Sequence, residues 1–306
     1  MEQLEFAPHE LAGTDLFTKP IDVSLPIGDV FGPKVRTVAG GEDNIREYVA
    51  SALKRGWPEH KWVPPHTGEL VIAGGGPSLN NRKVREKIKW RIKSGKAALF
   101  SVNGAHDHLL SHGIKSHFSA LLDAKEKVKD YISPINETAY FIASQCHPLT
   151  LDKFENFRKF LYHHEAPYLG QTFDSKRNHV NPSVFAHVGL EALLIGYRLG
   201  FRTFILYGLD SSYTDGELYA YKKDNPYAEV LNVIAKNAVT GKEYKFKTNS
   251  HMACQAEDFK NFVGFWQHFV NRGLYQPISI TFHGDGYLPT AAGILHHQFP
   301  WVNQCL

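Results

Sequence analysis

Short apolar runs alternate with amphipathic stretches along the chain from residue 69 onward. Apolar runs bounded by polar residues predict buried strands, and apolar residues recurring every three or four positions predict helices. The strands are expected at Glu69–Ala73, Ala97–Val102, His117–Leu122, Thr138–Ala143, Phe157–Tyr162, Arg202–Tyr207 and Ile278–Phe282. The helices are expected at 42–56, 78–94, 105–112, 124–132, 184–199 and 251–272. This alternation is typical of an α/β fold with a mainly parallel sheet and helices on both faces.

Two segments depart from the alternation. Residues 1–65 contain many prolines and are expected to form an N-terminal extension or cap, so that residues 66–306 make up the main domain. Residues 213–250 are polar and rich in tyrosine, and within them 230–248 could form a hairpin that turns near Thr240-Gly241. A long excursion of this kind is often a lid or binding loop, and a decorative insertion is the alternative.

Polar residues follow the predicted strands at the points where they end. They are Gly74-Gly75-Gly76-Pro77-Ser78, Asn103-Gly104, Asp123, Ser144-Gln145 and Asp210. The carboxyl ends of parallel strands meet at one edge of the sheet, and ligands of such sheets lie beyond that edge. The pattern therefore predicts a shared crevice for a ligand.

The glycine turn Gly74–Ser78 offers a site for an anion. A strand that runs through glycines into a helix leaves backbone N–H groups without partners at the helix start, where the dipole favours negative charge. Glycine allows close approach of the ligand, Pro77 suits a first helical turn and Ser78 adds a hydroxyl. The P-loop pattern is absent, and Leu79 replaces the third glycine of a dinucleotide fingerprint. A bound phosphate or nucleotide is the expectation.

Two more helix starts carry candidate residues. His187-Val188-Gly189 lies in the helix expected at 184–199, where Gly189 permits close approach to a phosphate; plain helix packing is the alternative. His251 follows Asn249-Ser250 at the start of the last predicted helix and could act as a general base. An ordinary residue of the helix cap is the alternative for His251.

Bulk composition narrows the class of protein. The chain has 306 residues, 43% hydrophobic and 21% charged, which is typical of a soluble protein with a sizeable core. No apolar run approaches the ~20 residues that span a bilayer, and the start lacks a signal-peptide pattern. The three cysteines form no CxxC pair, so a cytoplasmic protein without a disulfide framework is expected. The oligomeric state stays open, a homo-oligomer included.

Neither the charge of the chain nor its candidate metal ligands identify a partner or a bound metal. The net charge of +3 identifies no nucleic-acid partner, although residues 80–96 are rich in lysine and arginine and could meet phosphates; a solvated helix face is the alternative. His108 and His112 share a helix face but lack a third ligand, so no metal site is expected. The scattered acids Asp123, Asp210 and Asp215 could hold Mg²⁺ through phosphates of a bound nucleotide.

Several motifs together resemble the MptE-like domain family. They are VIAGGGPSL, FSVNGAHDHLLSHGI, LLDA, YGLDSSYTDGE, NSHMACQAEDF and HGDGYLP, and the resemblance covers roughly residues 68–292. That family includes archaeal 6-hydroxymethylpterin diphosphokinases and bacterial Maf flagellin glycosyltransferases. The resemblance implies a Rossmann-like nucleotide-binding domain and a transferase activity, and it does not select one reaction.

A more distant likeness is to the Campylobacter-type bacterial sialyltransferases. In those enzymes the turn that matches Gly76–Leu79 and the asparagine that matches Asn103 hold a cytidine nucleotide. Two tyrosines stabilise their leaving phosphate, and Tyr213 and Tyr219 are similarly placed here. Their catalytic histidine falls at Gln255, which cannot act as a base, so the resemblance implies that His251 takes this role or that the reaction differs.

The favoured interpretation is a nucleotide-sugar-dependent glycosyltransferase with a CMP-, UDP- or GDP-linked donor. The donor phosphates would lie across Gly75–Ser78 and His187–Gly189, while Asn103, Asp123, Ser144 and Gln145 would hold the base and ribose. The acceptor stays open among a glycan, a protein and a nucleic acid. The alternatives are a pterin diphosphokinase that transfers pyrophosphate from ATP with Mg²⁺, and a nucleotide-binding module without catalysis.

Overall fold

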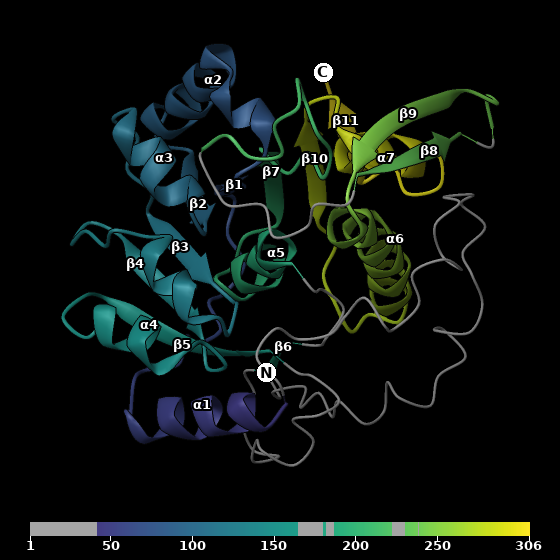
Figure 1. The fold of residues 1–306 in the computed structure, drawn as a ribbon. Coiled ribbons are helices and arrows are strands. Elements are labelled where there is room, and N and C mark those ends of the chain that lie inside the picture. Colours follow the sequence, from purple (N-terminus) through teal and green to yellow (C-terminus); the bar gives the residue numbers. More distant parts are fainter. Residues whose placement is uncertain (1–41, 165–179, 182–186, 222–229, 238) are drawn as a thin grey trace.

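A nine-stranded sheet forms the centre of the molecule in the computed structural model, which describes residues 42–164, 180–181, 187–221, 230–237 and 239–306 (Figure 1). The strands run in the order β11-β10-β7-β1-β2-β3-β4-β5-β6, and each neighbouring pair is parallel. Their bounds are β1 Glu69–Ala73, β2 Ala97–Val102, β3 Phe118–Leu121, β4 Ala139–Ala143, β5 Lys159–His164, β6 Val180–Asn181, β7 Thr203–Tyr207, β10 Ser279–His283 and β11 Val302–Cys305. The predicted Rossmann-like α/β fold is confirmed.

The order of the strands creates a point where the chain reverses direction across the sheet. From β1 the chain moves outward through β2, β3, β4, β5 and β6, and it then returns to β7 on the opposite side of β1. The loops after β1 and β7 therefore diverge. In open parallel sheets a crevice forms at such a switch point, beyond the carboxyl ends of the strands.

Helices cover both faces of the sheet (Figure 1). Their bounds are α1 Glu42–Lys54, α2 Arg82–Lys93, α3 Ala105–Ser111, α4 Pro148–Lys153, α5 Val188–Arg198, α6 Ser250–Asn271 and α7 Tyr287–Leu295, with short 3-10 helices at η4 Pro77–Asn80 and η5 Glu126–Asp130. Successive side chains of a strand point to opposite faces. Val71 and Leu99 accordingly pack with Ile88 of α2 and Leu109 of α3, in a buried cluster of their own.

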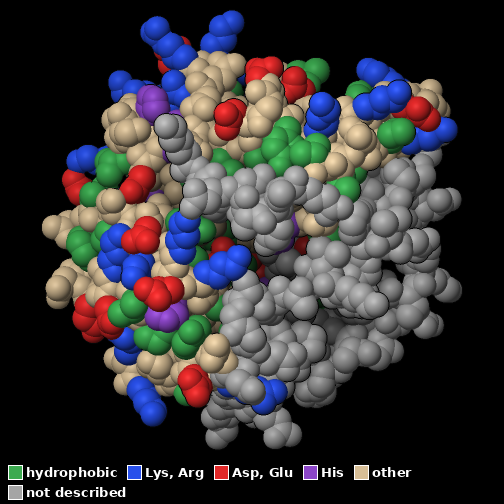
Figure 2. All heavy atoms as spheres, in the orientation of Figure 1, with side chains coloured by type: hydrophobic (Ala, Val, Ile, Leu, Met, Phe, Trp, Pro, Cys, Tyr) green, Lys and Arg blue, Asp and Glu red, His purple; other side chains and the backbone are tan. Residues whose placement is uncertain are grey.

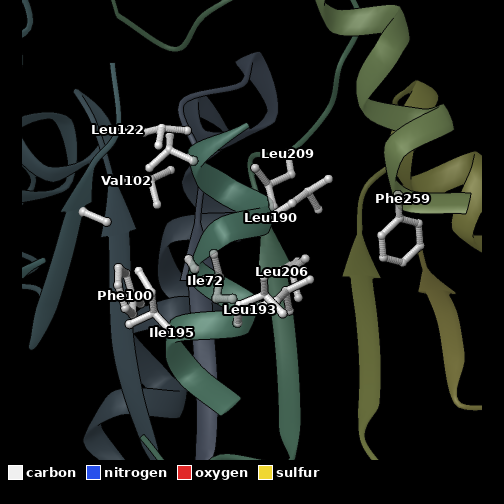
Figure 3. Close-up of a cluster of buried hydrophobic side chains, with 14 of the residues drawn as sticks. Ile72, Phe100, Val102, Leu122, Leu190, Leu193, Ile195, Leu206, Leu209 and Phe259 are labelled. Carbon is white, nitrogen blue, oxygen red and sulfur yellow. The ribbon is translucent and has the colours of Figure 1, made fainter. Parts of the chain in front are cut away.

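The opposite face of the sheet is covered by α5, which is buried along its whole length. Figure 3 shows Leu190, Leu193 and Ile195 of this helix beside Ile72 and Phe100 of the sheet. A helix buried on all sides positions the residues at its first turn rigidly against the strand ends.

The basic helix predicted within 78–94 forms as η4 and α2. Val84, Ile88 and Ile92 belong to the cluster beneath it, as their spacing predicts, and Lys and Arg side chains project from its outer side at the top of Figure 2. Arg91 pairs with Glu69 at 3.1 Å. Most of the basic side chains are thus exposed, and a contact of this face with phosphates stays a prediction.

The hairpin predicted in 230–248 forms a separate antiparallel sheet of β8 (Leu231–Lys236) and β9 (Glu243–Thr248). Its turn closes with the Gly241 N–H donating to the Asn237 carbonyl at 2.8 Å, and Gly241 has a left-handed φ of 71°. The hairpin contacts α7 and lies outside the central sheet (Figure 1). Its role as a lid stays a prediction.

Several elements differ from the sequence-based expectation. The helix expected at 124–132 is the short 3-10 helix η5, and α4, α7, β6 and β11 were not predicted. The first helix, α1, ends within the expected range and contacts α4, where Arg55 pairs with Asp152 at 2.6 Å. Residues 1–41 of the proposed extension lie outside the described residues. Among the described helices, none has the length and apolarity that a bilayer-spanning segment requires.

Candidate functional site

A polar cleft lies at the switch point, where β1, β2, β3 and β7 end and α5 and α6 begin. Its lining consists of Gly74–Gly76, Val102, Asn103, Leu122, Asp123, His187, Val188, Gly208–Ser211, Leu218, Tyr219, Tyr221, His251, Met252 and Gln255. Residues from seven separate stretches of the sequence therefore meet there, among them the polar ends of β1, β2, β3 and β7, as the sequence predicts.

The glycine turn is fixed to the loop after β7 by backbone hydrogen bonds. The Gly74 N–H donates to the Tyr207 carbonyl at 2.8 Å, and the Gly76 N–H donates to the Gly208 carbonyl at 2.7 Å. The Ser78 N–H donates to the Asp210 carboxylate at 2.8 Å. Pro77 has no N–H group, which leaves Gly75 as the remaining member of the turn. Within the described part of the chain, the Gly75 N–H has no hydrogen-bond partner. A ligand can therefore use the Gly75 N–H.

Asp210 connects the two loops from within the protein. Its side chain is buried, and this burial raises the pKa of the carboxyl, while the hydrogen bond from the Ser78 backbone opposes the shift. A Cβ atom at Gly76 or at Gly286 would overlap Asp210, so both glycines permit its close packing. Asp210 occupies the start of η4, where the sequence analysis expected a phosphate.

The Tyr221 side chain packs over Gly75, the residue of the glycine turn whose N–H has no partner among the described residues. A Cβ atom at Gly75 would lie 2.5 Å from the Tyr221 hydroxyl, and one at Gly104 would lie 2.6 Å from its ring. The Ala220 N–H donates to the Gly75 carbonyl at 2.9 Å and holds the segment in place. Burial raises the pKa of the Tyr221 phenol. Tyr219 stacks on Tyr221 with 5.9 Å between ring centroids, so the two tyrosines form one wall of the cleft.

Asn103 has one feature typical of a functional position. Its backbone is left-handed with φ of 47°, a conformation that asparagine adopts more readily than most other residues except glycine. Its Oδ1 atom is buried and has no hydrogen-bond partner among the described residues. Buried polar atoms are nearly always paired, so an unpaired acceptor on a cleft wall favours contact with a ligand.

The first turn of α6 brings two polar side chains to the cleft. Asn249 caps the helix, and its Oδ1 accepts from the Met252 N–H at 2.8 Å. His251 and Gln255 are four residues apart and so share the helix face that lines the cleft. Glutamine cannot act as a base, and the sequence alone does not mark Gln255 as a site residue, yet Gln255 lies in the cleft beside His251.

The start of α5 also reaches the cleft. His187 caps this helix, and its Nδ1 accepts from the Gly189 N–H at 3.1 Å. His187 and Val188 line the cleft, whereas a Cβ atom at Gly189 would overlap the side chains of Leu209 and His187. Gly189 therefore has a packing role, the alternative that the sequence left open.

The remaining candidates lie outside the described lining of the cleft. They are Pro77, Ser78, Gly104, Ser144, Gln145, Gly189 and Tyr213. The Ser144 Oγ is 2.9 Å from His163 Nδ1, and the Gln145 Nε2 donates to the Leu122 carbonyl at 3.0 Å, so the Ser144 hydroxyl and the Gln145 amide nitrogen are engaged within the protein. The Tyr213 N–H donates to the Lys247 carbonyl of β9 at 2.8 Å. Tyr221, Ser211 and Gln255 are the polar residues of the cleft that sequence reasoning missed.

The described residues contain no group of three His, Cys, Asp or Glu side chains arranged to hold a metal ion. His108 and His112 have ring centroids 4.7 Å apart, and the His112 Nδ1 lies 2.8 Å from the His108 carbonyl.

Comparison with known proteins identifies relatives of this fold. A family model described as 6-hydroxymethylpterin diphosphokinase MptE-like matches residues 59–216. Among solved structures, the Maf glycosyltransferase from Magnetospirillum magneticum AMB-1 is similar over 80% of this chain, with 17% identity and a TM-score of 0.55. The match covers 37% of that protein's chain, so this chain spans little more than a third of its length.

A trans-2-enoyl-CoA reductase from Clostridium acetobutulicum in complex with NAD also aligns, with 8% identity, a TM-score of 0.25 and coverage of 87% of this chain and 65% of the other. No sequence among the curated proteins matches significantly.

Proposed function

The chain belongs to the MptE-like family, and from this premise we propose that it is a glycosyltransferase that uses a nucleotide-linked sugar as its donor. The fold that it shares with a Maf glycosyltransferase supports this proposal. The observation that carries it is the cleft itself, in which Tyr219 and His251 lie together with the one glycine of the turn that has a free N–H.

In the proposed reaction, residues on different sides of the cleft have different roles. The Gly75 N–H contacts a donor phosphate, and Asn103 and Asp123 contact the nucleoside. An acceptor oxygen attacks the anomeric carbon and loses its proton to His251. The bond between that carbon and the phosphate oxygen breaks, and the nucleotide leaves with the electron pair. The Tyr219 phenol donates a hydrogen bond to the departing phosphate as its negative charge grows.

Tyr219 carries this role rather than Tyr213. Tyr219 lines the cleft, whereas Tyr213 lies outside the described lining, where its backbone pairs with Lys247 of the hairpin. The expected pair of phenols therefore reduces to one donor in the cleft. Tyr221, stacked on Tyr219, is the second phenol close to the glycine turn.

Pyrophosphoryl transfer from ATP is the second candidate. The description of the family model favours it, and the carboxylates of Asp123 and Asp210 line the cleft, where they could bind Mg²⁺ held by ATP phosphates. That reaction would release AMP and would stop when EDTA removes the metal. A nucleotide-binding module without catalysis would bind its ligand and turn nothing over.

A thermal-shift screen with CMP, UDP, GDP and ATP tests these proposals, with Mg²⁺ and with EDTA. A ligand at about 100 times its Kd adds about 2.7 kcal/mol to the free energy of unfolding, which gives a clear shift in Tm. We expect CMP, UDP or GDP to stabilise the protein in EDTA, and the matching nucleotide sugar to be consumed when acceptors are added. Stabilisation by ATP alone, with AMP as the product and only with Mg²⁺, would instead establish the second candidate.

A further inference from the structure

Gln255 presents an unused hydrogen-bond donor to the cleft. Its side chain is 3% exposed, and its Oε1 accepts from the Ser211 hydroxyl at 2.5 Å. Its Nε2 is buried and, among the described residues, has no hydrogen-bond partner. Gln255 belongs to the lining of the cleft, so this donor lies at the edge of the space that a ligand would occupy.

The surrounding contacts fix which end of the amide faces the ligand. Ser211 has a left-handed backbone with φ of 52°, and its carbonyl accepts from the Thr248 hydroxyl at 2.7 Å. These features fix the Ser211 backbone, and the Ser211 hydroxyl donates to the amide oxygen and leaves the NH₂ group on the other side. A buried donor without a partner costs about 1–3 kcal/mol, and a ligand group that accepts its hydrogen bond removes this cost.

The ligand group must be an acceptor, and the cleft also offers the opposite partner. The Asn103 Oδ1 is a buried acceptor without a partner in the described structure, on another wall of the same cleft. A hydroxyl group both accepts and donates hydrogen bonds, so a ligand with several hydroxyls satisfies both atoms. Gln255 lies one helical turn from His251, the proposed base, and therefore near the reacting carbon rather than near the nucleoside.

We infer that Gln255 binds a hydroxyl oxygen of the donor's transferred sugar through Nε2, with Ser211 as the residue that orients its amide. This inference rests on the proposed function, because it assigns the sugar half of a nucleotide sugar to this side of the cleft. It also gives Gln255 a role that needs no titratable group. The Campylobacter-type sialyltransferases have their catalytic histidine at the matching position.

The test compares nucleotide sugars with the bare nucleotides. Calorimetric titrations measure the affinities of the wild-type protein for UDP-N-acetylglucosamine, GDP-mannose and CMP-N-acetylneuraminate, and for UDP, GDP and CMP. Gln255→Met keeps the length of the side chain but removes its donor. Gln267→Met is the matched control on the same helix, because Gln267 pairs with Asn271 and Trp301 outside the cleft.

We expect Gln255→Met to weaken binding of the preferred nucleotide sugar about tenfold, which corresponds to about 1.4 kcal/mol, and to leave affinity for the bare nucleotide within about twofold. Gln267→Met should change neither affinity. The double variant Ser211→Ala, Gln255→Met removes both partners of the buried hydrogen bond, so its Tm should equal or exceed that of the wild type.

Three results would overturn the inference in distinguishable ways. Unchanged discrimination between nucleotide sugar and nucleotide in Gln255→Met would refute the contact and leave the proposed function intact. A lower Tm of the double variant, together with equal losses for both ligands, would show that the pair has only a structural role. Failure of the wild type to bind any of the six compounds would remove the proposed function, and the sugar contact with it.

Discussion

Gly75→Ala should push the Tyr221 ring out of its place, and a double-mutant cycle can measure the cost. The new methyl carbon would lie 2.5 Å from the Tyr221 hydroxyl and 2.8 Å from the nearest ring carbon. Ordinary contact begins near 3.4 Å, so the hydroxyl must retreat by about 0.9 Å, the difference between 3.4 and 2.5 Å. The backbone of Gly75 is not left-handed, so alanine itself fits the main chain.

The surroundings of the ring set the magnitude. The ring also packs over Gly104, where it occupies space that the Cβ atom of any other residue would fill, because such an atom would lie 2.6 Å from the ring. Its neighbour Ala220 is bonded to the Gly75 carbonyl at 2.9 Å, which ties the backbone down. Overpacking of this kind typically costs about 1–3 kcal/mol. Alanine in place of glycine also restricts the unfolded chain, which offsets the loss by about 0.4–1 kcal/mol.

Urea denaturation of the wild type, Gly75→Ala, Tyr221→Ala and the double variant gives the coupling between the two positions. Once the ring is absent, Gly75→Ala should be neutral or slightly stabilising, so the coupling energy should be about 1–3 kcal/mol. The same cycle with Tyr244→Ala, on the hairpin strand β9, is the control and should be additive. Additivity within about 0.5 kcal/mol for the Tyr221 cycle would refute the packing described here.

The same four proteins also report on the ligand. If a donor phosphate uses the Gly75 N–H, the methyl group blocks it whether or not Tyr221 is present. Gly75→Ala and the double variant should both lose binding of the nucleotide found in the thermal-shift screen, and Tyr221→Ala should keep it. Wild-type affinity in the double variant would place the phosphate elsewhere.

Two further predictions use other parts of the site and its support. Tyr219→Phe should lower kcat about 10²–10³-fold and leave Tm and nucleotide affinity unchanged. Tyr213→Phe should be close to wild type. Equal effects of the two variants in steady-state kinetics would contradict the assignment of Tyr219 as the hydrogen-bond donor to the leaving phosphate. Burial lowers the pKa of His283 from 6.5 to about 4, with smaller contributions from Lys87 and Arg91. Between pH 6.5 and pH 4, His283 is therefore protonated in the unfolded chain and neutral in the folded protein. The free energy of unfolding should fall as the pH drops through this range, by at most about 1.4 kcal/mol per pH unit. His283→Phe keeps a ring to stack on Tyr207 and should lose this slope in urea titrations at several pH values.

The central strands could be predicted because parallel strands buried on both faces are continuous apolar runs. The segments Glu69–Ala73 and Ala97–Val102 were predicted with the bounds that the structure has. By contrast, α7 carries the apolar sequence YLPTAAGIL and is buried almost throughout, so it shows no polar face for a helical period to reveal. The edge strand β11, with the sequence VNQC, has too few apolar residues to stand out.

The site was predictable to the extent that it depends on strand ends near the switch point. Asn103 follows β2, next to β1, and it lines the cleft. Ser144 and Gln145 follow β4, three strands from β1, which corresponds to about 14 Å at the usual spacing between strands. The sequence shows which strands end in polar residues, but it does not show the order of the strands in the sheet. Asn103 could therefore not be distinguished from Ser144 and Gln145 by sequence alone. Tyr221 and Gln255 belong to a loop and a helix that reach the cleft only through packing.

Tyr221 packs over Gly75, so a ligand that approaches the Gly75 N–H from that side must displace the ring, and such competition would link the stability of the fold to the function of the cleft. A ligand that binds only when the ring has moved shows an apparent affinity reduced by the fraction of molecules with the ring displaced. Tyr221→Ala removes that requirement, so the bare nucleotide should bind more tightly to this variant than to the wild type. Because Tyr219 stacks on Tyr221, displacement of the Tyr221 ring would also remove one contact of the Tyr219 ring. A loss of nucleotide affinity in Tyr221→Ala would instead mean that the ring forms part of the bound site.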